Sequence, residues 1–444
     1  MQSSSIFHRS LEKSYPTAVK GEGVYLITDK GQKILDGCCG AAVSSVGHGN
    51  QEVIEAVVDQ AHNIAFAHSS FFTSDPAEQL AKTIIERSDN AFSKVTFLCS
   101  GSEAVESALK IARQYHIYNG EPERIHFIGR NSSYHGNTLG AVALGNNIAR
   151  REPFEPILSD VFKHVSRCFY DADGAGLSER EYEDRLIAEW EDKINTLGPK
   201  TVAAVVVEPV GGATLGAVPA TPTYLPRLKE LCERHGILVI FDEVMCGMGR
   251  VGTYHAWQSL GGVGPDLQSI GKGLGAGYQP LSAVLIGKKV YDIFEEHSKG
   301  ASKFVSGHTF QGHSMACAGA LAVQRILKRD GLIPQVKERG ILLGSLLREG
   351  LSSFIAGHGA SLRGLGLFRA VDFGRLGESV GGPLAAEVAE ESFKQGAAVY
   401  LCSTAVDAVL FAPPFIISED EVSILAGTFL KAFKTVLERR KAAK

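Results

Sequence analysis

The sequence predicts an α/β fold in which helices cover both faces of a mostly parallel sheet. Short β-rich runs alternate with helical patterns through the middle of the chain, which is the order typical of parallel sheets. Every residue after Thr201 in the run 201–207 is apolar, as expected of a strand that helices cover on each side. No repeat of 20 to 50 residues is visible, which argues against a solenoid or propeller.

The predicted elements of this sheet are five strands and two of the helices between them. The strands span 94–99, 124–128, 201–207, 237–241 and 281–286. The helices have apolar residues three and four positions apart and span 103–115 and 222–235. The second helix stops before Gly236, a residue typical of a helix C-terminus.

The pattern of predicted strands and helices changes after Met315, which predicts a domain boundary there. A helix over 316–327 leads to a second α/β region, which ends in a helix over 419–440 and contains β-like stretches at 364–372, 397–401 and 409–412. The opening segment has a short β-like stretch at 24–29 and is expected to pack against this region. The predicted division is therefore an N-terminal segment 1–60, a large domain 61–314 and a small α/β domain 315–444.

Composition and charge exclude several classes of protein. The 444 residues include 45 Lys and Arg against 49 Asp and Glu, without a basic patch that would indicate nucleic-acid binding. No stretch approaches the roughly 20 apolar residues that span a bilayer, and the first ten residues lack the apolar part of a secretory signal. The eight cysteines are scattered and interpreted as reduced thiols. We expect a cytoplasmic protein with no membrane or nucleic-acid partner.

Two opposite charges follow two expected buried strands. Asp242 closes the run 237–241, and Lys272 comes thirty residues later. Pyridoxal phosphate needs such a pair, since a carboxylate keeps its pyridine nitrogen protonated and an amine holds its aldehyde. Taken singly, Asp242 is more typical of a turn cap and Lys272 of a solvated loop lysine. Ligands of open α/β sheets gather at the carboxyl ends of the strands, so the residues that follow the other strands test this interpretation.

The segment after the strand 94–99 is a candidate phosphate site. Ser100 and Glu103 fit the capping box S-x-x-E that opens a helix. Gly101 allows close approach of the backbone, Ser102 adds a hydroxyl, and the helix dipole favours an anion. Because most capping boxes bind nothing, this signal depends on the other residues.

Two further segments place an aromatic and an acidic side chain after predicted strands. Tyr134 follows the strand 124–128 and could lie flat on a planar cofactor ring, with a packed turn tyrosine as the alternative. Glu208 ends the strand 201–207 and is expected either near the ring or as a structural anchor.

Two competing sites are disfavoured. Gly247, Gly249 and Gly252 match the dinucleotide motif G-x-G-x-x-G, but they follow the strand only after Asp242 and Glu243 and open no convincing helix. No metal site is expected, because His308 and His313, five residues apart, do not share a helix face.

Together these motifs resemble the class III, or omega, aminotransferases of the type I pyridoxal phosphate fold. The resemblance covers nearly the whole chain, in the order Leu35-Asp36-Gly37, Gly47-His48-Gly49, Ser100-Gly101-Ser102-Glu103-Ala104, Tyr134-His135-Gly136, Glu208-Pro209-Val210, Phe241-Asp242-Glu243-Val244, Lys272-Gly273 and Gly307-His308-Thr309-Phe310. It implies an α/β fold with a large cofactor-binding domain and a smaller α/β domain.

The resemblance also implies roles for individual residues. Lys272 would hold pyridoxal 5'-phosphate as a Schiff base and shuttle the proton, and Asp242 would pair with the pyridinium nitrogen. Thr309 would reach the phosphate of the neighbouring subunit, which implies a homodimer with shared active sites and leaves a tetramer open. The resemblance places Gly101 and Ser102 at the phosphate, Tyr134 on the ring and Glu208 beside the cofactor hydroxyl. It implies three further cofactor contacts, Ser100, His135 and Val244.

The implied reaction is a ping-pong transfer of an amino group from an amine or amino acid to a keto acid, ketone or aldehyde. A racemase, an aminomutase or an amine phospho-lyase on the same fold is the alternative, because the pocket decides the fate of the carbanion. A protein that only binds the cofactor is disfavoured, since it has no need of the mobile base Lys272.

One departure from the family bears on the substrate. Many members place an arginine shortly before a Pro-Pro pair near the end, to bind a carboxylate. No arginine precedes Pro413-Pro414, and Leu410 and Ser403 lie where it is expected. This favours a substrate without a carboxylate near the reacting amine. Other arginines that could serve, although a structural role is more typical, are Arg250, Arg363 and Arg369. Apolar candidates for the substrate pocket, with core packing as the alternative, are Phe71, Phe72 and Trp257.

Overall fold

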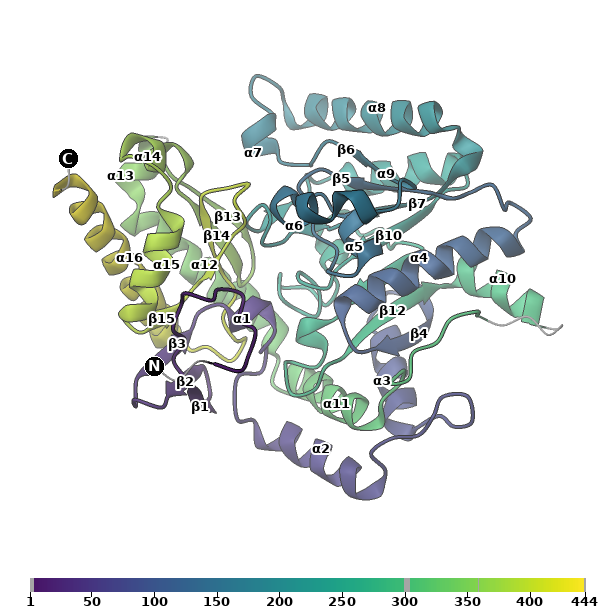
Figure 1. The fold of residues 1–444 in the computed structure, drawn as a ribbon, viewed down its shortest axis with the longest axis horizontal. Helices are drawn as coiled ribbons and strands as arrows, with labels where there is room; N and C mark the ends of the chain where they lie inside the picture. Colours follow the sequence, from purple (N-terminus) through teal and green to yellow (C-terminus); the bar gives the residue numbers. More distant parts are fainter. Residues whose placement is uncertain (1–3, 299–303, 358, 443–444) are drawn as a thin grey trace.

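A seven-stranded sheet forms the centre of the larger part of the molecule (Figure 1). The computed structural model describes residues 4–298, 304–357 and 359–442. The strand order is β4-β12-β11-β10-β7-β5-β6, and only β12 runs antiparallel to its neighbours. The strands are β4 (Phe92–Leu98), β5 (His126–Arg130), β6 (Phe162–Val165), β7 (Val202–Val207), β10 (Leu238–Asp242), β11 (Leu267–Ile270) and β12 (Ser282–Gly287). The predicted mostly parallel sheet is confirmed.

Helices cover both faces of this sheet, which explains why its central strand β7 is apolar throughout. Val205 and Val207 belong to a core shared with Trp190 of α8 (Glu179–Leu197) and with α9 (Tyr224–Arg234). Ala204 and Val206 point to the opposite side and share a core with α4 (Gly101–Tyr118). Alternate residues of one strand thus fill two separate cores.

The sequence predicts no bounds for two strands of this sheet, although a buried strand is expected before Lys272. The strand β6 lies at an edge of the sheet and is mostly half-buried. The strand β11 is fully buried, yet two of its four residues are polar. Gln268 of β11 accepts a hydrogen bond from Trp257 Nε1 at 2.9 Å, so its polarity is satisfied inside the core. A central strand with a hydrogen-bonded polar residue does not look like an apolar run.

The smaller part consists of two four-stranded sheets and the C-terminal helices, at the left of Figure 1. One sheet has the order β1-β2-β3-β15 and the other β13-β14-β17-β16. Their strands are β1 (Ala18–Glu22), β2 (Tyr25–Thr28), β3 (Lys33–Asp36), β13 (Ser361–Leu365), β14 (Phe368–Asp372), β15 (Ala397–Ala398), β16 (Tyr400–Leu401) and β17 (Ala408–Phe411).

Two expectations for the C-terminal region were wrong in detail. The stretch 364–372 is not one strand, because a turn containing Gly366 at φ 53° folds it into the hairpin β13–β14. The stretch 397–401 divides between the two sheets, since β15 pairs with β3 and β16 pairs with β17. Pairing of β3 with β15 does place the N-terminal segment against the C-terminal region. The boundaries at residues 60 and 314 remain a prediction.

The predicted long helices are present. The helix α11 (Ser314–Arg329) packs against α2 (Gln51–Asn63) and α3 (Asp75–Ile85), and α16 (Glu419–Ala442) packs against α12 (Leu332–Gly350) and α15 (Ala385–Lys394). None of the helices in the described ranges combines the length and apolar character of a membrane span. The remaining elements are α1 (Cys39–Ala42), α5 (Leu139–Leu144), α6 (Ile148–Arg151), α7 (Tyr170–Asp173), α10 (Lys288–Ser298), α13 (Ser352–Ala356), α14 (Gly374–Ser379), β8 (Val210–Gly211), β9 (Val218–Pro219) and the short 3-10 turns Glu152–Ile157, Pro199–Thr201, Ala256–Ser259 and Lys272–Leu274.

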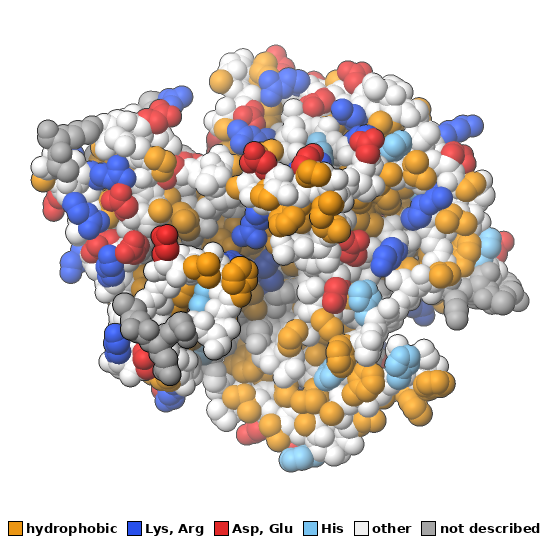
Figure 2. Space-filling view, in the orientation of Figure 1, with side chains coloured by type: hydrophobic (Ala, Val, Ile, Leu, Met, Phe, Trp, Pro, Cys, Tyr) orange, Lys and Arg blue, Asp and Glu red, His pale blue; other side chains and the backbone are white. Residues whose placement is uncertain are grey.

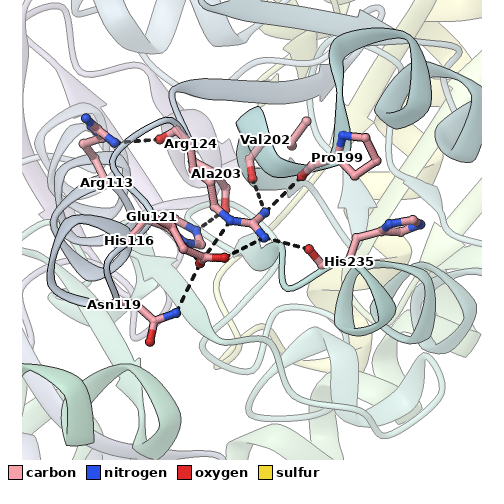
Figure 3. A network of polar contacts seen from close by, with 9 residues as sticks. All are labelled: Arg113, His116, Asn119, Glu121, Arg124, Pro199, Val202, Ala203 and His235. Atoms are coloured by element: carbon pink, nitrogen blue, oxygen red, sulfur yellow. Dashed lines mark hydrogen bonds and ion pairs between the residues drawn. The ribbon is translucent and has the colours of Figure 1, made fainter.

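A buried polar network ties the end of α4 to the start of β7 and the end of α9 (Figure 3). Arg124, only 4% exposed, donates to the carbonyl oxygens of Val202 at 2.8 Å and His235 at 2.9 Å. It also forms an ion pair with Glu121 at 3.0 Å. His116 in turn contacts the Ala203 carbonyl at 2.8 Å. One guanidinium therefore joins three elements that are distant in sequence.

Arg124→Met should destabilise the fold strongly. The variant leaves the buried carbonyl groups of Val202 and His235 without their donor, and each buried polar group left unsatisfied costs about 1–3 kcal/mol. The measurement is the free energy of unfolding from urea titration. Arg234→Met is the control, because Arg234 pairs with Glu191 and Glu230 at the surface and should matter by about 1 kcal/mol or less. Equal losses in both variants would contradict a special role for Arg124.

Candidate active site

A cavity of about 670 Å³ lies where five strands of the large sheet end at their carboxyl edge. Its walls include the residues that follow β4, β5, β7, β10 and β11, together with residues of the smaller part such as Ala41 and Ser403. The face in Figure 2 is hollowed between the two parts of the molecule. Both the volume and the position are typical of small-molecule sites in open α/β folds.

Lys272 enters this cavity directly after β11. Its backbone has φ 44°, in the left-handed region that costs a non-glycine residue energy and is found at functional sites. Burial lowers the pKa of the Lys272 amine, and the nearby charges of Asp242 and Glu208 oppose this effect. A lowered pKa increases the neutral fraction of the amine, which is the nucleophilic form. The backbone and the surroundings of Lys272 therefore suit an amine that bonds to a carbonyl carbon.

Asp242 ends β10 and is held by two hydrogen bonds. Its Oδ2 lies 2.8 Å from His135 Nδ1, and its Oδ1 accepts from the Val244 backbone N–H at 3.0 Å. Asp242 is 5% exposed, so the carboxylate is shielded but still reaches the cavity. His135 Nε2 is buried and has no hydrogen-bond partner within the described ranges. The hydrogen bonds with His135 and Val244 thus fix the orientation of the Asp242 carboxylate in the cavity wall.

The N-terminus of α4 forms a cradle for an anion, and the predicted capping box is present. Ser100 Oγ accepts from the Glu103 N–H at 3.3 Å, and Glu103 Oε2 accepts from the Ser100 N–H at 3.2 Å. The first N–H groups of a helix have no partner inside it, so those of Gly101 and Ser102 can bind a ligand. A Cβ on Gly101 would lie 2.6 Å from Val244 Cγ1, so glycine is required there.

Tyr134 and Glu208 are joined through the backbone. Glu208 Oε1 accepts from the Tyr134 N–H at 3.1 Å, and its Oε2 accepts from the Gly212 N–H at 2.8 Å. Burial raises the pKa of the Glu208 carboxyl. Tyr134 is half-buried and lines the cavity. Glu208 therefore fixes the loop that carries Tyr134.

The structure brings together most of the predicted cofactor residues but not the predicted substrate residues. The cavity is lined by Ser100, Gly101, Ser102, Tyr134, His135, Glu208, Asp242, Val244 and Lys272. Outside its lining, Thr309 lies exposed in a turn and Phe71 is 79% exposed. Trp257 and Leu410, 2% and 0% exposed, are packed in the core and do not line the cavity, so the expectation that they form the substrate pocket was wrong. Both side chains belong to the same hydrophobic core, and Trp257 Nε1 also donates to Gln268 of β11.

The alternative arginines have structural partners. Arg250 donates to the Pro413 carbonyl at 2.6 Å, Arg363 pairs with Asp372 at 2.8 Å, and Arg369 donates to the Gly364 carbonyl at 2.7 Å. Sequence reasoning instead missed two arginines, Arg9 and Arg150, that do line the cavity. Neither follows a predicted strand, so no local signal marks them.

Comparison with known proteins identifies the family. The profile described as "Aminotransferase class-III" matches residues 7–433, almost the whole chain. The chain belongs to the class III aminotransferases. It is 38% identical to an uncharacterized aminotransferase of Schizosaccharomyces pombe over 97% of this chain and 95% of that protein. It is 34% identical to the putrescine–pyruvate aminotransferase of Pseudomonas aeruginosa over 73% of this chain and 70% of the relative.

A solved structure agrees with this assignment. The omega transaminase of Pseudomonas jessenii in complex with PMP superposes with a TM-score of 0.89 at 31% identity, covering 96% of this chain and 94% of that one. The enzyme is therefore a class III transaminase that uses pyridoxal phosphate. The site fits this cofactor, because it offers a shielded carboxylate at Asp242, an amine at Lys272 and an anion cradle at Gly101 and Ser102.

Gly101→Ala should weaken cofactor binding by about tenfold or more, since the methyl group would displace Val244 from beside the anion cradle and a lost charged hydrogen bond is worth about 1.5–3 kcal/mol. Fluorescence titration of the apoenzyme with pyridoxal phosphate measures the effect. Gly427→Ala on α16 is the control, because a Cβ there meets no atom within 4 Å. Unchanged affinity in Gly101→Ala would place the phosphate elsewhere.

Proposed function

We propose that this transaminase is an omega-aminotransferase that takes an amino group from a terminal amine or an omega-amino compound and transfers it to a keto acid such as pyruvate or 2-oxoglutarate. One observation carries this proposal. Lys272 and Asp242 line a cavity whose wall at residues 400–404 contains no arginine to hold a carboxylate beside the reacting carbon. The names of the P. aeruginosa and P. jessenii relatives support the same reaction class.

In this proposal each residue has one task in the ping-pong cycle. Pyridoxal phosphate, when bound, supplies an aldehyde and an electron-accepting ring. Lys272 would hold the cofactor through its Nζ, and the same amine, when free, would accept and return the proton at the reacting carbon. Asp242, oriented by His135 and Val244, would keep the ring nitrogen protonated.

Three residues hold the cofactor in the proposed orientation. Gly101 and Ser102 bind the phosphate through N–H groups and the Ser102 hydroxyl. Tyr134 would lie against the ring, and Glu208 fixes the backbone of Tyr134 by accepting its N–H. The relatives reported above are aminotransferases, and no observation in the described ranges favours a racemase, an aminomutase or a phospho-lyase.

The amine donor should react with the holoenzyme when no keto acid is present, and the keto acid should then reverse the change. Absorbance spectra of the holoenzyme, recorded with single amines or amino acids and no keto acid, test this expectation. The visible band should bleach with a donor and return with pyruvate or 2-oxoglutarate. A band that persists while the donor is racemised or loses a leaving group would overturn the proposal.

We also propose that the active unit is a homodimer with two shared sites. Phe71, Phe72, Val305 and Phe310 are each at least 52% exposed, and an exposed apolar patch of this kind indicates an interface. Figure 2 shows hydrophobic side chains at the lower right, where the loop after α2 lies. Thr309 is next to Phe310 of this patch and does not line the cavity of its own chain, so in this proposal it reaches the phosphate of a second copy. Sedimentation of a single monomeric species would contradict the dimer.

We place the enzyme in the cytoplasm. All eight cysteines are unpaired, as is typical of proteins in reducing compartments. Cell fractionation tests this assignment, and recovery with the membrane or the secreted fraction would contradict it.

A further inference from the structure

The turn that carries Lys272 contains residues in the left-handed region of φ that are not glycine. Lys272 has φ 44° and Ala276 has φ 51°. Such residues cost energy and persist only where the surrounding structure enforces them. Inside the turn, the Leu274 N–H donates to the Gly271 carbonyl at 2.9 Å, and the Ala276 N–H donates to the Lys272 carbonyl at 3.1 Å. The carbonyl oxygens of Gly273 and Leu274 accept hydrogen bonds from outside the turn.

Ser45 of the N-terminal segment makes the first of these outside contacts. Its side chain is fully buried, and its Oγ donates to the Gly273 carbonyl at 3.3 Å. The Ser45 carbonyl in turn accepts the Phe415 N–H at 2.7 Å, so the segment after β17 fixes the position of the serine. Ser45 does not line the cavity. It therefore holds the turn of Lys272 from behind the site.

Gln324 of α11 makes the second contact. Its Nε2 donates to the Leu274 carbonyl at 3.2 Å, and its Oε1 accepts from the Tyr254 hydroxyl at 2.8 Å. The side chain is fully buried and does not line the cavity. A buried amide with its donor and its acceptor both engaged is held in one orientation. The helix α11 thus fixes the carbonyl group that follows the one held by Ser45.

We propose that Ser45 and Gln324 are positioning residues for Lys272. They hold the carbonyl oxygens of two consecutive residues, Gly273 and Leu274, and so keep the backbone of Lys272 in the strained conformation from which its side chain reaches the cavity. Without these bonds the turn relaxes, and the amine moves away from the reacting carbon. This inference rests on the proposed role of Lys272 and adds two residues that line no part of the cavity.

Hydrogen exchange of the purified full-length protein tests the inference without substrate. Ser45→Ala and Gln324→Met each remove one side-chain donor to the turn. The peptide 271–277 should exchange about three- to tenfold faster in either variant, the effect of one lost hydrogen bond. The exchanging groups that report this change are the N–H groups of Leu274 and Ala276, which are bonded inside the turn.

Ser392→Ala is the matched control. Ser392 on α15 is also fully buried, and its Oγ donates to the Ala397 carbonyl at 2.9 Å. This variant loses the same kind of hydrogen bond in the smaller part of the molecule. It should lower the melting temperature about as much as Ser45→Ala does, and it should leave the exchange of 271–277 and kcat unchanged.

Steady-state kinetics of the holoenzyme separate positioning from a general loss of stability. In Ser45→Ala and in Gln324→Met, kcat should fall about 10- to 100-fold, because a displacement of about 1 Å at a catalytic group can cost about 100-fold. KM for the amine donor should change by less than about twofold, since neither residue contributes to substrate binding.

Three results would overturn the inference: unchanged exchange of 271–277 in both variants, the wild-type kcat in both variants, or equally fast exchange of this peptide in Ser392→Ala. A wild-type holoenzyme that reacts with no amine donor would instead refute the proposed function. The exchange measurement distinguishes these failures, because it needs no substrate and shows directly whether Ser45 and Gln324 hold the turn.

Discussion

Lys272→Ala is expected to abolish transamination. The variant loses the amine that bonds to the cofactor and the base that moves the proton, and general acid–base catalysis alone contributes roughly 10²–10⁴-fold. The fold should persist, because alanine removes a buried amine and its backbone meets the same strain at φ 44° as lysine does. The measurements are steady-state rates and the visible spectrum, which should lose the band of the lysine-bound cofactor.

A small external amine distinguishes a chemical role of Lys272 from a structural one. Methylamine should restore part of the proton-transfer rate in Lys272→Ala, because it can occupy the vacated space and accept the proton. Lys288→Ala is the matched control, since Lys288 is exposed and pairs with Asp292 at 2.7 Å. Wild-type turnover in Lys272→Ala would refute the proposed mechanism as a whole.

Asp242→Asn is expected to lower kcat by about 10²–10³-fold, the size measured when one electrostatic contact to developing charge is removed. The neutral amide cannot hold the ring nitrogen protonated, so the ring withdraws electrons less effectively. KM should change less than kcat, since Asp242 acts on the cofactor rather than on the substrate. The amide oxygen can still accept from the Val244 N–H, so the melting temperature should stay close to that of the wild type.

Asp266→Asn provides the contrasting control. Asp266 is buried and pairs with Lys229 at 2.6 Å, outside the lining of the cavity. This variant should lower stability and leave kcat of the folded enzyme unchanged. A fully active Asp242→Asn enzyme would remove Asp242 from the proposed mechanism.

Local signals in the sequence predicted the framework of the site well. The strands that lead to Glu208 and Asp242 are visible as apolar runs because both faces of the sheet are buried. The capping box at Ser100 depends on only four consecutive residues, and it is present as expected. The parallel order then places these strand ends at one edge, which is why the predicted cofactor residues line one cavity.

Other features depend on contacts between distant segments. The bounds of the buried strand β11 were not predicted, because Gln268 interrupts its apolar pattern and satisfies its polarity through Trp257, a residue of another turn. The same packing removes Trp257 from the pocket, whereas composition alone made it an apolar candidate for the substrate.

Residue type and order thus determined the α/β class, the cofactor and the two residues proposed for catalysis, because periodicity, turn chemistry and charge at strand ends are local properties of a chain. Only the tertiary structure decided which side chains line the cavity. Arg150 lines it with its guanidinium 5.2 Å from the Tyr134 ring, while Leu410 is turned into the core by the pairing of β17 with β14. Such choices follow from packing between segments far apart in sequence, which no local pattern records.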